Sequence, residues 1–306
     1  MKCSRIGMLL VLGLGPLWTV GAFCQTYVSI NLLECAIQGV CGFPLQVHPL
    51  SINEQGEIAG YYLGGAGDIP TGFVRAAGAG TITSFSAPGT FAETFANSIN
   101  DTGTITGYYA VPPFTFPNFT THGFVRDPEG NITTFDPTGS VNTQAFSINA
   151  GGAITGYYNE SNLVIHGFVR ERNGTITSFD PSGSISTKAV SINAHGTING
   201  YYQVANMSVH GFVRRAGGTI TSFDPAESTG TVVTAINNAG AITGYYTVAN
   251  GLALSALCDG RVERLYRSTR RGARGPSRPA STTMGQLLGL TATTAAPTDL
   301  SARPKE

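Results

Sequence analysis

Short apolar segments alternate with turn residues along most of the chain, and this pattern recurs. The clearest copy begins at Ser147 and reads SINAGGAITGYYNESNLVIHGFVRERNGTITSFDPSG. Its segments rich in β-branched and aromatic residues predict four strands, at residues 145–149, 153–158, 166–170 and 175–180. Gly, Asn and other polar residues mark the turns between them, and Pro181 ends the last segment. No run with a helical period is long enough to compete.

The four-segment pattern repeats every 44 to 49 residues. The tripeptide SIN, or AIN in the last copy, begins at Ser51, Ser98, Ser147, Ser191 and Ala235. GYY follows in all five copies, whereas GFVR follows only in the first four. Four antiparallel strands in a repeat of this length correspond to one propeller blade. The sequence therefore predicts an all-β fold, a β-propeller of about five four-stranded blades whose last blade lacks a recognisable third strand.

One strand-like segment stands alone before the first repeat. Thr26–Asn31 (TYVSIN) is similar to the fourth segment of a repeat. In a closed ring such a strand completes the last blade and removes its free edge. Here it would join residues 235–237 and 241–246 of the fifth repeat. An open, incomplete ring is the alternative.

Residues 1–22 have the pattern of a secretory signal peptide. Lys2 and Arg5 precede an apolar run, and small residues at 20–22 precede Phe23. The apolar run is short for a membrane span. We therefore expect cleavage, with no stable membrane span afterwards, and a mature protein that is secreted, periplasmic or held at the cell surface. An uncleaved membrane anchor is the alternative.

Residues 23–50 are predicted to contain the isolated strand and a disulfide loop. Cys35 and Cys41 lie close together in an exported and therefore oxidising setting, and we predict that they form a disulfide. A metal site is the alternative, but no cluster of His and Cys supports one. The partner of Cys24 is left open.

Charge divides the chain near residue 255. Residues 23–255 hold 14 acidic and 7 basic side chains, whereas residues 256–306 hold 4 acidic and 9 basic ones. The net acidic body disfavours nucleic acid as a partner. The change in composition indicates propeller repeats over residues 51–255 and a disordered tail over residues 256–306.

A shift of reading frame explains both the basic tail and the missing GFVR. When the codons after Ser255 are read one nucleotide back, permitted codons give GFVRRAGGTIVSFD, against GFVRRAGGTITSFD from Gly211. Residues 281–289 similarly give INNNGAITG, against INNAGAITG from Ile236. Only the first base of each shifted codon is free to choose, so the agreement predicts that the tail is an out-of-frame reading of further repeats. A native disordered basic tail is the alternative.

Three repeats carry a histidine at the start of the third segment and an aspartate at the end of the fourth. The pairs are His122 with Asp136, His166 with Asp180, and His210 with Asp224. A short turn between the two strands places these ends opposite each other. A ring of acid–base groups or metal ligands is one interpretation. A structural hydrogen bond repeated in each blade is favoured, because an active site is usually singular.

Tyrosine pairs and arginines also recur in register. Successive side chains of a strand point to opposite faces, so one tyrosine of each pair packs between blades and the other can lie exposed near a rim. The possible binding aromatics are Tyr62, Tyr109, Tyr158, Tyr202 and Tyr246. Exposed rings can stack on sugars or on a partner protein, with core packing as the alternative. The arginines that end the third segment are predicted to be solvated strand ends, with an anion-binding rim as the alternative; they are Arg75, Arg126, Arg170 and Arg214.

The repeat resembles a known group of sequences. The pattern IN-x-x-G-x-I-x-G, then H-G-F-V-R, then T-I-T-x-F-D resembles the HAF-type extracellular repeats of bacterial secreted proteins. Those repeats have H-A-F where this chain has His122-Gly-Phe124 and its equivalents. The resemblance covers Ser51–Tyr246. It implies export from a bacterium and a repeated β-architecture, and it transfers no catalytic residue.

No GxSxG, HExxH or phosphate-loop motif stands out, so we expect no catalytic residue, metal or cofactor. The even spread of motifs favours a secreted, non-enzymatic binding or scaffold propeller whose partner is a glycan or a cell-surface protein. The alternative is a lyase or hydrolase that acts on polysaccharide at the central channel. Its candidate residues are the acidic or histidine side chains without equivalents in other repeats, Glu93, Asp101 and His195.

Overall fold

The computed structural model describes residues 46–259, with gaps at 65–68, 79, 90–91, 113–119 and 250–254. For residues 255–259 it describes the backbone alone. The chain divides into two compact parts, Met1–Ser268 and Thr269–Glu306, and every described residue belongs to the first. The predicted signal peptide, the Thr26–Asn31 strand, the Cys35–Cys41 disulfide and the tail beyond Asp259 lie outside the described residues. Within the described ranges no helix is long and apolar enough to cross a membrane.

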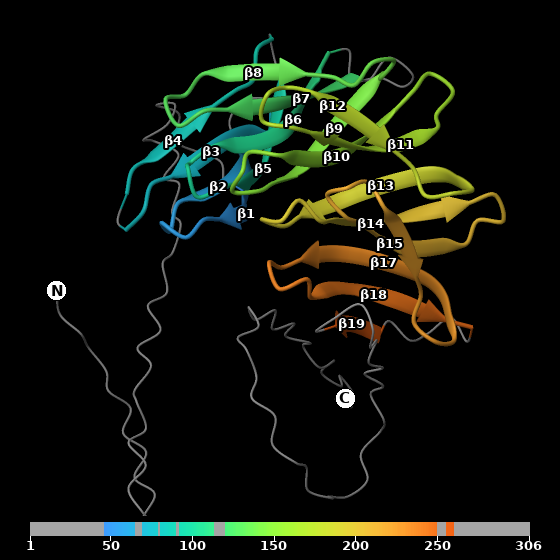
Figure 1. Ribbon diagram of the computed structural model, residues 1–306. Coiled ribbons are helices and arrows are strands. Elements are labelled where there is room, and N and C mark those ends of the chain that lie inside the picture. Colours follow the sequence, from blue (N-terminus) through green and yellow to red (C-terminus); the bar gives the residue numbers. More distant parts are fainter. Residues whose placement is uncertain are drawn as a thin grey trace, which may run out of the picture. The chain divides into compact units, whose positions relative to one another are not determined.

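The described residues form nineteen β-strands and no helix (Figure 1), grouped in five repeats that we number as blades 1 to 5. Blade 1 contains β1 (Gln46–Ile52), β2 (Ile58–Leu63), β3 (Thr71–Arg75) and β4 (Ile82–Phe85); blade 2 contains β5 (Glu93–Ile99), β6 (Ile105–Val111), β7 (Thr120–Arg126) and β8 (Ile132–Phe135); blade 3 contains β9 (Asn142–Ile148), β10 (Ile154–Asn159), β11 (Ile165–Arg170) and β12 (Ile176–Phe179); blade 4 contains β13 (Ser184–Ile192), β14 (Ile198–Val204), β15 (Val209–Arg214) and β16 (Ile220–Phe223); blade 5 contains β17 (Ser228–Ile236), β18 (Ile242–Val248) and β19 (Ser255–Asp259).

Blades 1 to 4 are antiparallel meanders in which spatial order follows chain order. The four segments predicted in blade 3 are confirmed, with bounds that differ by at most three residues. The first blade is a sheet of its own, and single parallel bridges from the third strand of one blade to the first strand of the next join blades 2 to 5. This radially repeated meander confirms the all-β fold and the propeller blades.

Two glycines recur because the chain packs too tightly for a side chain. A Cβ on Gly156, the glycine of GYY, would overlap the backbone oxygen of Gln144 in the neighbouring first strand. A Cβ on Gly167, the glycine of GFVR, would lie 2.8 Å from the ring of Phe179. The equivalent glycines of the described blades meet the same neighbours. Both motifs are therefore explained by close packing within the blade.

The apolar core is divided into clusters that lie between consecutive blades. Between blades 1 and 2, the cluster contains Ala59, Ala96, Ile105 and Phe124, and Phe85 packs against it. Similar clusters follow at the next three interfaces. Each blade thus buries its apolar surface mainly against its neighbours, as expected for a repeat that cannot form a core alone.

The arginine of GFVR belongs to these interfaces. The guanidinium carbon of Arg126 lies 4.9 Å from the ring centre of Phe85 in the preceding blade. The contacts of Arg170 with Phe135, at 5.0 Å, and of Arg214 with Phe179, at 4.8 Å, repeat this geometry. Arg75, Arg126 and Arg214 are 7 to 8% exposed. The prediction that these arginines are solvated strand ends is therefore wrong, because a cation–π contact holds three of them at a blade interface.

Blade 5 has a third strand that the sequence does not predict. The strand β19 pairs with β18, and Ala256 lies opposite Tyr245 while Asp259 lies opposite Ile242. In blade 4 the same places are taken by Gly211 and Arg214. The boundary expected after residue 255 thus falls inside a strand, and residues 256–259 occupy the register of GFVR.

Among the described strands, blades 1 and 5 share no pairing. The strand β1 pairs with β2 alone, and β19 pairs with β18 alone. Figure 1 shows the blades in chain order, from blue to orange. Strand pairing within the described residues is therefore that of an open series.

Candidate functional site

The asparagine of the SIN tripeptide makes two kinds of hydrogen bond, one within its own turn and one to the next blade. The Oδ1 atom of Asn149 accepts a hydrogen bond of 2.9 Å from the amide of Ala153 and so stabilises its own turn. Its Nδ2 atom donates a hydrogen bond of 3.1 Å to the backbone oxygen of Asn193 in the next blade. The same bond joins Asn53 to Asn100, Asn100 to Asn149, and Asn193 to Asn237, at 3.0 to 3.1 Å.

The serine of the tripeptide adds a second link between blades. The amide of Ile192 donates a hydrogen bond of 3.3 Å to Ser147 Oγ in the preceding blade. Equivalent bonds reach Ser51, Ser98 and Ser191. We call the paired serine and asparagine bonds the SIN clamp. In the sequence alone this tripeptide marks the repeat, and only its asparagine is explained, as a turn residue.

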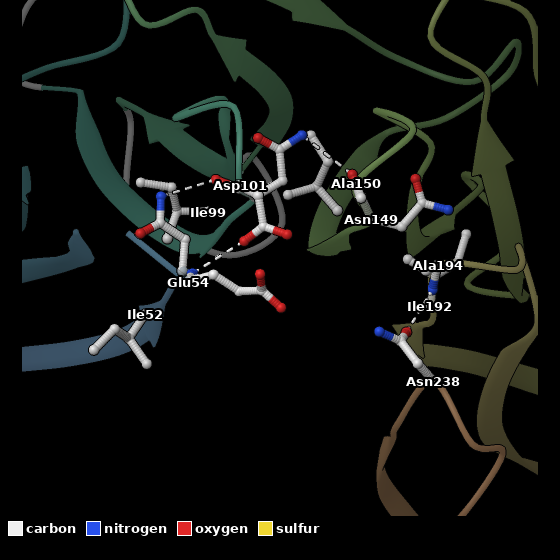
Figure 2. A pocket seen from close by; sticks show the side chains of 12 residues that line it. Ile52, Glu54, Ile99, Asp101, Asn149, Ala150, Ile192, Ala194 and Asn238 are labelled. Atoms are coloured by element: carbon white, nitrogen blue, oxygen red, sulfur yellow. Dashed lines mark hydrogen bonds between the residues drawn. The ribbon is translucent and has the colours of Figure 1, made fainter. Parts of the chain in front are cut away.

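The turns after the SIN clamp line a pocket of about 360 Å³, to which all five blades contribute. In Figure 2 the carboxylate of Asp101 accepts a hydrogen bond from the backbone amide of Glu54, and the amide side chain of Asn238 accepts one from Ala194. Acidic and amide side chains are thus the polar side chains of the lining, and bonds between blades occupy many of them. Among the described residues no cluster of three or more His, Cys, Asp or Glu side chains could hold a metal ion.

The structure brings each predicted His/Asp pair together. The Nδ1 to Oδ2 distance is 2.8 Å for His122 with Asp136 and 2.6 Å for the other two pairs, His166 with Asp180 and His210 with Asp224. The six side chains are 21 to 38% exposed, and each histidine ring lies 5.3 Å from the second tyrosine of its blade. Each pair stays within its own blade, which supports a repeated structural hydrogen bond.

The tyrosines expected to be available for binding are buried. Their exposed fractions are 2, 7, 4, 8 and 1% for Tyr62, Tyr109, Tyr158, Tyr202 and Tyr246. The hydroxyls of Tyr158 and Tyr202 donate hydrogen bonds to Ser178 and Ser222 in their own blades. These rings are core residues, so the expectation that they form an exposed binding surface is corrected. The first tyrosine of each pair is less buried than the second: Tyr61, Tyr108, Tyr157 and Tyr201 are partly buried, and Tyr245 is 43% exposed.

The first tyrosines lie in an aromatic row that is continuous from blade 1 to blade 3. Ring contacts join His48 to Tyr61, Tyr61 to Phe95, Phe95 to Tyr108, Tyr108 to Phe146, and Phe146 to Tyr157, with centroids 4.7 to 6.3 Å apart. The ammonium of Lys188 then lies 5.2 Å from the ring centre of Tyr157 and 6.0 Å from that of Tyr201. We call these residues, with Tyr245, the aromatic row. Strand alternation predicts two tyrosine faces but does not say which one remains accessible.

The phenol groups of the aromatic row lie close to one another. Partial burial raises the pKa of Tyr108, Tyr157 and Tyr201, and a neighbouring tyrosine of the row adds to each increase. Within the described residues none of the five first-tyrosine hydroxyls has a hydrogen-bond partner, yet none is a fully buried unpaired atom. The row therefore offers rings for stacking and unpaired hydroxyls that water or a ligand can reach.

The three residues considered as catalytic candidates, Glu93, Asp101 and His195, do not form one cluster. Asp101 lines the pocket of Figure 2, whereas His195 lines a different pocket beside Arg215. Glu93 lies at the start of β5, where burial raises the pKa of its carboxyl group. No hydrogen bond joins any two of these three side chains in the described part of the chain. The structure thus gives no support to a catalytic set made from them.

Comparison with known proteins assigns no family to the chain. No protein-family model matches the sequence, and no curated protein matches it. Among solved structures, a putative TolB from Agrobacterium tumefaciens is 12% identical, with a TM-score of 0.48, 74% of this chain covered and 81% of that chain. A lectin from Aleuria aurantia, described as a six-bladed β-propeller with a novel mode of fucose recognition, is 15% identical, with a TM-score of 0.44, and 72% of this chain and 77% of that chain are covered. The virginiamycin B lyase of Staphylococcus aureus is 14% identical, with a TM-score of 0.38, and 74% and 89% are covered.

Similarities at these identities and TM-scores assign no function. The class is defined by the strand pairing itself: this chain is an all-β repeat protein built from propeller blades.

Proposed function

We propose that this chain is an exported, non-enzymatic binding protein and that the aromatic row binds a glycan. The row is the observation that carries the proposal, because it joins partly exposed rings and unpaired hydroxyls over consecutive blades. Sugar rings present apolar C–H faces that stack on aromatic rings, and their hydroxyls both donate and accept hydrogen bonds as phenols do. Because the rings recur from blade to blade, the row matches a polymer whose sugar units also recur along its length.

The chemistry around the row favours a neutral or weakly charged polymer. Glu93 lies near Tyr108 on one side, and Lys188 lies beside Tyr157 on the other. The two charges have opposite sign, so no single-signed field selects a strongly charged ligand. A cell-surface protein that offers flat polar and apolar groups is the other partner expected from the sequence, and it is an outcome of the test below.

The repeated architecture supports binding over catalysis. The SIN clamp, the His/Asp pairs and the aromatic row recur from blade to blade, and the groups proposed for catalysis lie in different places. The resemblance to HAF-type repeats, and the bacterial export that it implies, remain part of the proposal.

A glycan array tests the proposal directly. The unmodified protein should bind at least one class of polysaccharide fragment, and Tyr157→Ala should weaken that binding about tenfold, the loss expected for one stacked ring. Tyr157→Phe removes only the hydroxyl and should have a smaller effect. Thr177→Ala, an exposed change on β12 away from the row, is the matched control.

Two results would overturn the assignment of the row. One is the absence of any glycan on the array together with capture of a surface protein by unmodified protein and Tyr157→Ala alike. The other is glycan binding that Tyr157→Ala leaves unchanged. Export is tested separately, because cleavage of the proposed signal should give a mature N-terminus at Phe23.

A further inference from the structure

The face of blade 5 that points away from blade 4 is exposed, although the same face of the other blades is covered. Thr243 is exposed and Tyr245 is 43% exposed. The residues that hold the position of Thr243 in blades 1 to 4 are all 0% exposed; they are Ala59, Thr106, Thr155 and Asn199. In blade 1, Ala59 belongs to the apolar cluster shared with blade 2. We call the face with Thr243 and Tyr245 the open face.

The open face also carries an unused half of the SIN clamp. Asn237 Oδ1 accepts a hydrogen bond of 2.8 Å from Ala241, as its equivalents do in their own turns. The Nδ2 atoms of the four earlier asparagines all donate to the backbone of the next blade. The Nδ2 atom of Asn237 has no such partner within the described residues. In each earlier blade the acceptor of this donor is the backbone oxygen of the equivalent asparagine one blade further on.

The strand β19 shows that the backbone of blade 5 continues in the register of the repeat. Residues 256–259 lie where Gly211–Arg214 lie in blade 4, but their sequence is ALCD instead of GFVR. Aspartate thus stands at the arginine position, and within the described residues no cation lies over Phe223 as Arg214 lies over Phe179. The strand β19 thus has the backbone register of the repeat, but its side chains are not those of the repeat.

We propose that the open face is the docking surface for a sixth blade of the same repeat, encoded by the DNA of the tail in the shifted frame. Read one nucleotide back, the codons from Ser255 restore GFVR to β19 and supply TIVSFD as the fourth segment. The same frame then gives INNNGAITG, whose first asparagine provides the backbone oxygen that Asn237 lacks. Blade 5 has Ala235 where the other blades have the serine of the SIN clamp, and alanine has no hydroxyl. Of the two clamp bonds, the asparagine bond is therefore the one that forms at this interface.

The other possible occupants fit less well. A second copy of this chain would have to present β1, where Leu50 and Ile52 are 49% and 61% exposed, and would make head-to-tail oligomers. The residues before β1 lie outside the described structure, and they contain one repeat-like segment, Thr26–Asn31. Only the shifted frame offers the segments of a whole interface in the right order.

The first step of the test is to read the codons from position 250 to 290. Codons that do not spell GFVR and INNNGAITG in the shifted frame overturn the proposal. Where they do, the protein as translated is compared with a frame-corrected protein, whose gene carries one inserted nucleotide at codon 255. The control is the corrected protein with Asn237→Ala.

The corrected protein should be a monomer with a higher urea midpoint, and hydrogen exchange of the β18 amides should slow by more than about tenfold, because a covered blade opens less often than a terminal one. Asn237→Ala should reverse part of this protection. Equal exchange in the two proteins overturns the proposal. So does a translated protein that is already protected at β18, either as an oligomer, which assigns the face to a second copy, or as a monomer, which assigns it to the segment before β1. These readouts do not depend on glycan binding.

Discussion

Replacing Asn199 with threonine should stabilise the fold. Asn199 lies in β14 and is 0% exposed, and neither its Nδ2 nor its Oδ1 atom has a hydrogen-bond partner. Blades 2 and 3 have threonine at this position, and the hydroxyls of Thr106 and Thr155 each donate a hydrogen bond of 2.8 Å to a backbone oxygen on the third strand. A threonine at position 199 of blade 4 would donate the equivalent hydrogen bond to the backbone oxygen of Phe212.

The magnitude follows from what is buried. A buried polar group without a partner costs about 1–3 kcal/mol, and a satisfied hydrogen bond contributes about 0.5–1.5 kcal/mol. Threonine is similar in size to asparagine and is favoured in strands. We therefore expect Asn199→Thr to raise the free energy of unfolding by about 1–3 kcal/mol.

Urea denaturation followed by circular dichroism measures this gain as a higher midpoint with an unchanged slope. Thr155→Asn makes the reverse change in blade 3 and should lower the midpoint by a similar amount. Thr243→Asn makes it at the exposed equivalent in blade 5 and should change little. A midpoint for Asn199→Thr that is equal to or below that of the unmodified protein would refute the reasoning, since it would mean that the amide is already satisfied.

Three further predictions concern packing, the SIN clamp and pH. Gly200→Ala should prevent stable folding, because the new Cβ overlaps the backbone oxygen of Lys188, whereas Gly217→Ala, with nothing within 4 Å, should be tolerated; thermal melts compare the two. Asn149→Ala removes a turn bond and the bond to the next blade and should cost about 1–3 kcal/mol in urea denaturation. Burial raises the pKa of Tyr157, so folding favours its neutral phenol. The contribution of this phenol to stability should be constant below about pH 10 and should be lost as the pH rises above it. Denaturation midpoints measured below and above about pH 10 should therefore fall less steeply in Tyr157→Phe than in the unmodified protein.

The sequence by itself determined the elements and their order. Alternating apolar segments, Gly and Asn turns and the repeat period predicted four strands per blade, because each depends on chemistry within a few residues. The meeting of His166 with Asp180 also followed from the sequence. In a hairpin, the turn length sets the register, and the register sets which residues are opposite each other.

The tertiary structure decided which surface is covered. Tyr157 and Tyr158 are equivalent to a sequence argument, yet Tyr158 is buried within the core and Tyr157 belongs to the aromatic row. Arg126 is read from the sequence as a solvated strand end, but Phe85 of the preceding blade stacks on it. The SIN clamp became visible in the same way, through partners 44 to 50 residues distant.

These differences have one physical cause. The pairing of strands within a blade is local, so the sequence of one repeat contains it. The burial of a side chain, and the partner that satisfies it, depend on the neighbouring blade that stacks on its face, and no pattern within one repeat specifies that stacking.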